Sequence, residues 1–347
     1  MTDTRILAAR LKNQCLADTS MRSPEAVVSW LGAVQAQDYA GAKWAIGLRT
    51  TGLTDADVER AFEAGRILRT HVLRPTWHFV VPADIRWMLA LTGSRVHMMN
   101  RRYGHAVGLD ERVFTRGRAA IERALEGGRQ LTRAEISAAL HRARLRLTGQ
   151  QLAHLLMDVE VAGSICSGPR RGRQFTYALL AERVPDARVL PRDEALAELT
   201  GRYFQSHGPA TLRDFAWWSG LAMKDARAGV EMTKSDVLVK PPEADSVRGA
   251  TYLLPNYDEY LIAYKDRRAI IDPARVRNLG VFTTAEHPHY LIVDGRVAGS
   301  WRRTLGSSSV SVDVAPYDAL RRGQRNALVD GARRFAQFLQ LECSLRL

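Results

Sequence analysis

The stretch that decides the fold is LTRAEISAALHRARLRLTGQQLAHLLMDVEVAGSICSGPRRGRQFTYALL, residues 131–180. Thr132 directly precedes a helical pattern, and Glu135 comes three residues after Thr132, which is the spacing of a capping box. The next helical pattern carries an apolar stripe at i, i+3, i+4 and i+7: Leu152, Leu155, Leu156 and Val159. Two alternating segments around a Gly-Pro-Arg turn follow. Two helices and then a β-hairpin are typical of a winged helix-turn-helix unit.

The turn of this predicted hairpin is strongly basic. Its tip, GPRRGR (168–173), contains Arg170, Arg171 and Arg173. Guanidinium groups bind phosphate oxygens through paired N–H donors, and phosphate contacts position a protein on a duplex. We therefore expect these three arginines to contact the DNA backbone.

Helices followed by a hairpin occur three times along the chain. In the first copy, a capped helix at 53–65 precedes two strands at 67–81. In the third copy, two helices at 210–232 precede a strand, a loop and a strand at 235–255. This repetition favours tandem winged helix units over a doubly wound α/β fold.

Further elements flank the three copies. We predict two helices at 4–15 and 24–36, a β-meander at 287–315 and a C-terminal helix at 319–341. The predicted class is α+β and mainly helical, with three tandem winged helix units and a small C-terminal sheet. The predicted domains are the N-terminal helices with the first unit, the second unit, the third unit, and the meander with the last helix: 1–92, 93–190, 191–286 and 287–347.

The charge narrows the class of partner. The 347 residues include 50 basic and 37 acidic side chains, with a net charge of +13, and only six of the basic residues are lysines. Residues 95–147 carry twelve arginines against five acids, and residues 296–347 carry nine against four. Arginine binds phosphate and stacks on bases, so nucleic acid is the expected partner. GC-rich coding also raises arginine content. The positive charge is therefore evidence for a nucleic acid partner only in combination with the winged helix pattern.

Several other classes of protein lack support. Cys15, Cys166 and Cys343 are far apart and form no CxxC spacing, which fits a reducing cytoplasm and no zinc site. The polar N-terminus is no signal peptide, and no run approaches the roughly 20 apolar residues of a membrane span. Walker A, GxGxxG, GxSxG and HExxH motifs are missing, and nothing nearby completes a metal site at His287 and His289. We expect a cytoplasmic protein that uses no metal or cofactor.

The segment RTHVLRPTWHFVV (69–81) allows two interpretations. It can be a half-buried hairpin in which His78 makes an internal hydrogen bond. It can also place His71, Arg74 and His78 beside a DNA groove, and we carry these three as candidate DNA contacts.

The segment LLPNYDEYLIAYKDRR (253–268) brings Asp258 and Glu259 close in sequence to basic residues. Such carboxylates are most often paired with the neighbouring cations, which leaves open that one of them faces a substrate. We count Lys265 and Arg267 among the candidate DNA contacts.

Two glutamines in AVQAQDY (33–39) stand between apolar stretches, although glutamine is usually exposed. Residues i and i+2 of a helix point about 200° apart, whereas an extended segment would direct Gln35 and Gln37 to the same side. A neutral amide can orient a water molecule but cannot take its proton. A catalytic site of this kind would need a very good leaving group, such as a cationic alkylated purine.

Three blocks of the chain resemble those of the AlkZ/YcaQ-type DNA glycosylases. They are LGAVQAQDYAGAKWAIGLRT, LRTHVLRPTWHFVVPADIRWMLAL and LLPNYDEYLIAYKDR, and the resemblance extends over nearly the whole chain in the same order. It implies tandem winged helices that form a basic concave surface. It also implies removal of alkylated bases from double-stranded DNA and, in some members, the unhooking of interstrand crosslinks.

The resemblance also implies a catalytic motif. One branch of the family has a Gln–apolar–Gln motif, which corresponds to Gln35-Ala36-Gln37 in this chain. The other branch has Gln–apolar–Asp, and Asp38 lies one position too far along the chain to match it. The glutamines would then position the water and contact the sugar. The family engages DNA with a β-hairpin, for which SWRRTLGSSSVSV (300–312) with Arg302 and Arg303 is our prediction.

We therefore predict a monofunctional, monomeric DNA glycosylase that acts on N7- or N3-alkylated purines without a cofactor. No lysine is well placed for lyase chemistry, and Lys43 is the nearest in sequence to the glutamines. The alternative is a non-enzymatic winged helix DNA-binding protein, such as a regulator or a protein that sequesters damaged DNA. RNA binding is weaker still, because no aromatic RNP-like strand is found.

Overall fold

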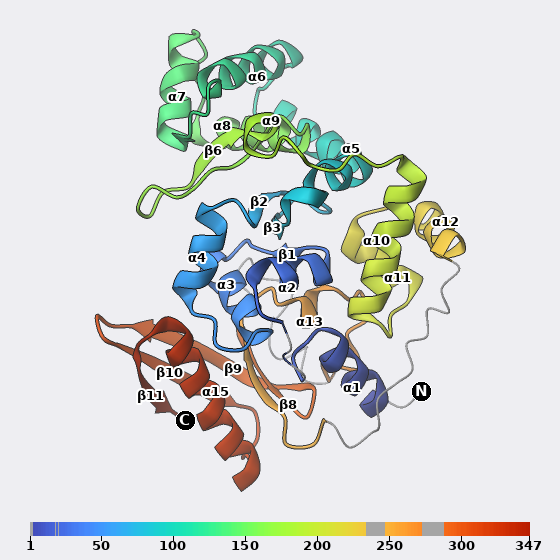
Figure 1. Cartoon of the computed structure of the whole chain (residues 1–347), viewed down its shortest axis with the longest axis vertical. Coiled ribbons are helices and arrows are strands. Elements are labelled where there is room, and N and C mark those ends of the chain that lie inside the picture. Colours follow the sequence, from blue (N-terminus) through green and yellow to red (C-terminus); the bar gives the residue numbers. More distant parts are fainter. Residues whose placement is uncertain (1–2, 18, 20, 234–246, 273–287) are drawn as a thin grey trace. The chain divides into compact units, whose positions relative to one another are not determined.

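The computed structural model describes residues 3–17, 19, 21–233, 247–272 and 288–347 (Figure 1). Helices make up about half of these residues and short sheets and hairpins much of the rest, so the predicted α+β class is confirmed. No helix in this described part is long and apolar enough to cross a membrane.

The chain divides into two compact units. The first comprises the described residues of Met1–Glu59, Thr200–Trp218 and Lys234–Leu347, and the second comprises Arg60–Leu199 and Ser219–Thr233. Three helices continue across the divisions of the chain: α4 (Asp55–Glu63), α10 (Arg192–His207) and, by its last residue, α11 (Leu212–Ser219). The predicted division at residues 92, 190 and 286 stays a prediction.

The second unit contains the stretch from 131 to 180. Its elements are β2 (Leu68–His71), β3 (Trp77–Val80), α5 (Pro82–Ala106), α6 (Glu111–Leu125), β4 (Leu131–Thr132), α7 (Arg133–Arg142), α8 (Gly149–Val161), β5 (Ile165–Ser167), β6 (Thr176–Leu179), α9 (Leu180–Arg183) and α12 (Met223–Thr233). The strands β4, β5 and β6 form a sheet in the order β4-β6-β5. The predicted stripe on α8 lies in a buried core together with Phe114, Ile121 and Ile136.

Capping residues set the starts of α7 and α8. The predicted capping box of Thr132 and Glu135 is confirmed at α7, and Thr148 with Gln151 forms a second one at α8. Each box satisfies backbone N–H groups that a helix leaves without internal partners. Both helix starts are therefore specified locally.

The hairpin of the first predicted copy is also confirmed. Strands β2 and β3 pair antiparallel, with Thr70 opposite His78 and His71 opposite Trp77. In the connection between them, Leu73 has φ +63, a backbone conformation that residues other than glycine seldom adopt.

The first unit combines helices with a five-stranded sheet. Its elements are α1 (Asp3–Asn13), α2 (Pro24–Leu31), β1 (Val34–Gln35), α3 (Tyr39–Leu48), α11 (Leu212–Ser219), β7 (Thr251–Leu254), α13 (Glu259–Ile262), β8 (His289–Val293), β9 (Arg296–Leu305), β10 (Ser309–Pro316), α15 (Arg322–Leu339) and β11 (Glu342–Arg346). The sheet has the order β11-β10-β9-β8-β7. The helix α15 packs on it through Phe335, whose ring centroid lies 5.2 Å from that of Trp301 (Figure 1).

The predicted meander is confirmed, as strands β8, β9 and β10 pair antiparallel in chain order. The turn between β8 and β9 uses Asp294 and Gly295 at φ +51 and +78, which suits a tight two-residue hairpin turn. The parallel strand β11 was not predicted. The second helix ends at Leu31 rather than at 36, because Gly32 takes φ +79 and ends it. The strand predicted near 235–240 lies outside the described residues.

Candidate functional site

The two glutamines lie on an extended segment between α2 and α3. Gln35 ends β1 and is 6% exposed, and its backbone N–H donates to Oε1 of Glu259 over 3.1 Å. Gln37 follows in the turn before α3, and its side chain is exposed. The pair therefore lies where the protein interior meets the surface, rather than in an enclosed cavity.

Glu259 fixes this segment from the start of α13. Its Oε2 accepts a hydrogen bond from Nε1 of Trp218 over 2.9 Å and lies 3.5 Å from Nε2 of His207. The Glu259 residue has no exposed surface. Since both carboxylate oxygens are engaged in the interior, Glu259 supports the backbone of Gln35 and does not face a substrate.

Asp258 forms a buried ion pair with Arg49. Nη1 and Nη2 of the guanidinium donate to the two carboxylate oxygens over 2.9 and 2.8 Å, and Nη2 also donates to Oε1 of Gln14 over 3.0 Å. Burial acts to lower the pKa of Arg49, but the charge and hydrogen bonds of Asp258 outweigh it, and the pKa is raised. The prediction that Asp258 pairs with its sequence neighbours is wrong, because its partner is 209 residues away.

Asp38 starts α3 directly after Gln37. Its Oδ1 accepts the backbone N–H of Gly41 over 3.0 Å, and its Oδ2 lies 3.6 Å from Nη2 of Arg303 on β9. A Cβ at position 41 would lie 2.8 Å from Oδ2 of Asp38 and 2.9 Å from Oδ1 of Asn256, so the ends of these two side chains would have to shift to accommodate it. The strand β9 thus brings an arginine to the QAQ segment.

His289 is the neighbouring group on β8. Its Nδ1 accepts the backbone N–H of Asn256 over 2.8 Å, and its ring centroid lies 4.8 Å from that of Trp301. Burial, followed by the positive charge of Arg303, lowers the pKa of His289 to about 4. The imidazole is therefore neutral at pH 7, with its proton on Nε2. Among the described residues, no three His, Cys, Asp or Glu side chains are placed to hold a metal ion.

Comparison with known proteins gives the family. The sequence profile described as DNA glycosylase AlkZ-like matches residues 28–338. The chain belongs to the AlkZ-like DNA glycosylases. A relative from Streptomyces sahachiroi, named an interstrand DNA cross-link repair glycosylase, is 24% identical over 322 residues, which cover 86% of each chain. The solved structure of Streptomyces sahachiroi DNA glycosylase AlkZ matches with a TM-score of 0.76 at 20% identity and covers 99% of both chains.

The two histidines predicted to lie beside a DNA groove are buried in this glycosylase. His71 places Nδ1 against the carboxylate of Glu160, and His78 donates from Nδ1 to the carbonyl oxygen of Thr76 over 2.9 Å. The half-buried hairpin with an internal hydrogen bond is thus the interpretation that matches their placement. Arg74, in the connection, is half-buried.

The predicted wing carries its arginines near the surface. Arg171 is exposed and pairs with Glu135 over 2.7 Å, Arg173 is exposed, and Arg170 is half-buried with its guanidinium 5.4 Å from the ring centroid of Phe175. The pKa of Glu135 is lowered to about 2, mainly because the backbone N–H of Thr132 donates to the carboxylate and, second, because Arg171 donates to it. This carboxylate therefore stays charged and offsets one positive charge of the wing.

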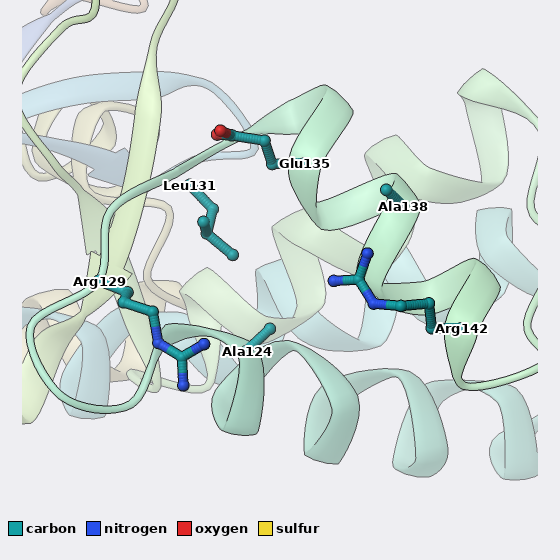
Figure 2. Close-up of a pocket in the computed structure, with 6 residues that line it drawn as sticks. All are labelled: Ala124, Arg129, Leu131, Glu135, Ala138 and Arg142. Carbon is teal, nitrogen blue, oxygen red and sulfur yellow. The ribbon is translucent and has the colours of Figure 1, made fainter.

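A small cavity of about 220 Å³ lies beside the wing in the same unit, lined by Ala124, Arg129, Leu131, Glu135, Ala138 and Arg142. Figure 2 shows the side chains of Arg129 and Arg142 extending into it from opposite sides. Nε of Arg129 donates to the carbonyl oxygen of Glu126 over 2.9 Å, which fixes its direction. Sequence periodicity does not indicate this pair, because its two arginines come from a loop and from the end of α7.

The second helix of the predicted winged helix unit, α8, is covered on one side by α5. Arg101 of α5 donates to Asp158 of α8 over 2.6 Å, and Nδ2 of Asn100 donates to the carbonyl oxygen of His154 over 2.9 Å. The α5-facing side of α8 is thus engaged within the protein and is not available to enter a DNA groove.

The remaining candidate DNA contacts lie in the first unit. Lys265 and Arg302 are exposed, whereas Arg267 and Arg303 are half-buried. Nε of Arg267 donates to the carbonyl oxygen of Leu261 over 2.8 Å. Of the four, Arg303 is the one that the structure brings to Asp38 and hence to the QAQ segment.

Proposed function

We propose that this DNA glycosylase hydrolyses the N-glycosidic bond of cationic N7- or N3-alkylated purines in double-stranded DNA. Bulky N7 adducts and interstrand crosslinks belong to the proposed substrates. This proposal rests mainly on the Gln35-Ala36-Gln37 segment, whose backbone is held by Glu259 and whose Gln37 side chain is exposed at the surface. The Streptomyces sahachiroi relative is named an interstrand DNA cross-link repair glycosylase, and this name supports interstrand crosslinks as substrates.

The chemistry of two amides supports this class of substrate. An alkylated purine already carries positive charge, so it leaves without being protonated, and the sugar develops oxocarbenium character. Amide oxygens stabilise such a cation electrostatically, and an amide orients the attacking water. The exposure of Gln37 suits an adduct too bulky for an enclosed pocket.

We propose an abasic product without strand cleavage. A lyase reaction needs a nucleophilic amine, and Nζ of Lys43 is held 2.7 Å from Asp55 and 2.7 Å from Glu59. An ammonium paired twice and buried is poorly suited to form a Schiff base.

We also propose that the elements from α6 to β6 form a winged helix unit that holds the DNA backbone. The order α6, β4, α7, α8, β5, β6 and the sheet order β4-β6-β5 support this assignment. The proposed backbone contacts are surface or half-buried cations: Arg74, Arg170, Arg171, Arg173, Lys265, Arg267, Arg302, Arg303, Arg129 and Arg142. His71 and His78 are left out because they are buried.

The direct test is base release from duplex oligonucleotides that carry either N7-methylguanine or a bulky N7 adduct. We expect free modified base and an abasic strand that breaks only after alkaline treatment. Unmodified duplex is the control. Tight binding to both substrates with no free base from either would refute the proposed activity.

The arginine pair of Figure 2 gives a prediction for binding. Arg129→Ala and Arg142→Ala should each weaken duplex binding and reduce the slope of log K against log salt by about 1. Each variant would make one phosphate contact fewer, so fewer counterions would be released from the DNA on binding. Fluorescence anisotropy at several salt concentrations measures this slope. Arg118→Ala is the matched control, because Arg118 lies on α6 and pairs with Glu122 over 2.9 Å. Equal slopes for all three variants would exclude the pair as a phosphate site.

A further inference from the structure

We infer that Asp38 accepts the proton of the attacking water, an inference that rests on the proposed function. Two neutral amides can orient a water molecule but have no basic site for its proton. A carboxylate close to the QAQ segment is therefore required if the water is to be activated. The described carboxylates around this segment can be compared one by one.

Four of these carboxylates are committed elsewhere. Asp258 and Glu259 are buried and hydrogen-bonded to interior partners. Asp55 and Glu59 both bind Nζ of Lys43 at 2.7 Å. Asp258 and Glu259 are therefore shielded from a substrate at Gln37, and Lys43 offsets the negative charge of Asp55 and Glu59.

Asp38 differs from them in three respects. It directly follows Gln37 in the chain, and its side chain is 26% exposed. Only its Oδ1 is used for the start of α3, since it accepts the N–H of Gly41. Its Oδ2 lies beside Arg303, at 3.6 Å, a distance longer than a hydrogen bond.

In the proposed step, the water oxygen bonds to C1′ of the deoxyribose, and the bond from C1′ to the purine nitrogen breaks. The electron pair of the broken bond neutralises the positive charge of the alkylated base, which leaves. The proton of the water passes to Oδ2 of Asp38, and a hydroxyl group remains on C1′. Among the described residues, Arg303 of β9 and the neutral His289 of β8 are charged or titratable groups that face Asp38.

Asp38→Asn and Asp38→Ser test this role. Both replacements are good helix N-caps, so α3 keeps its start while the carboxylate is lost. We expect single-turnover release of N7-methylguanine to fall by about 100-fold or more in both, which is the usual contribution of a general base. The acid limb of the wild-type pH–rate profile should disappear in both, and thermal unfolding should stay close to wild type.

The outcomes separate this inference from the proposed function. Release at the wild-type rate with the wild-type acid limb would show that Asp38 serves only as a helix cap. Slower release with an unchanged acid limb would make it a positioning residue and overturn the inference. In either case, wild-type release in the same assay would leave the glycosylase activity standing. If the wild type released no base from either substrate, both would fall.

Discussion

Gln37→Ala is expected to lower the rate of base release by about 10²- to 10³-fold, the usual cost of removing one preorganised group from a transition-state site. Gln37 is exposed, so its truncation leaves no buried group unpaired and the fold is retained. Duplex affinity should be nearly unchanged, because phosphate contacts supply most of it. Single-turnover release from an N7-methylguanine duplex and anisotropy with the same duplex measure the two quantities.

An exposed glutamine elsewhere provides the control for this variant. Gln150→Ala, in the first turn of α8, should release base at the wild-type rate. Gln35→Ala should lower both the rate and the thermal stability, because Gln35 is buried and its loss disturbs the interior around β1. Wild-type rates for Gln37→Ala would exclude an amide-based site at this segment.

The local part of the fold could be predicted from the sequence. The capping box of Thr132 and Glu135 and the apolar stripe on α8 depend on residues within one helical turn or two. The turn at Asp294-Gly295 is equally local. Such patterns express periodicity and capping, which are properties of short segments. The strand β11 escaped prediction because its place beside β10 is parallel and set by the preceding helix, not by a turn.

The candidate site could be located in the sequence but not built from it. The QAQ segment stood out because amides are unusual between apolar stretches, yet its support comes from Glu259, 224 residues away. Likewise, the sequence leaves open whether His71 lies beside a DNA groove or in a half-buried hairpin, because its partner Glu160 on α8 is 89 residues away. Periodicity does not specify which distant ionisable groups meet, so Asp38, Arg303 and His289 came together only in three dimensions.

The buried pair of Arg49 and Asp258 should dominate the stability of the first unit. Asp258→Ala leaves the Arg49 guanidinium buried with its main partner removed, and we expect the free energy of unfolding to fall by about 3–5 kcal/mol. Equilibrium urea denaturation measures this change. The exposed pair of Asp266 and Arg268 in the same segment is the control. Arg268→Ala should leave unfolding nearly unchanged, since an exposed ion pair is screened by solvent.

The same variant connects stability to the catalytic segment. Asp258 accepts the N–H of Tyr260 and caps α13, which carries Glu259 and so holds the backbone of Gln35. Asp258→Asn keeps an oxygen for this cap but loses the charge that balances Arg49. It should therefore unfold at lower urea concentration while retaining more base release at low temperature than Asp258→Ala. If both variants unfolded at the wild-type urea concentration, the buried pair would contribute nothing measurable, and Arg49 would be held by Gln14 and the Ala45 carbonyl instead.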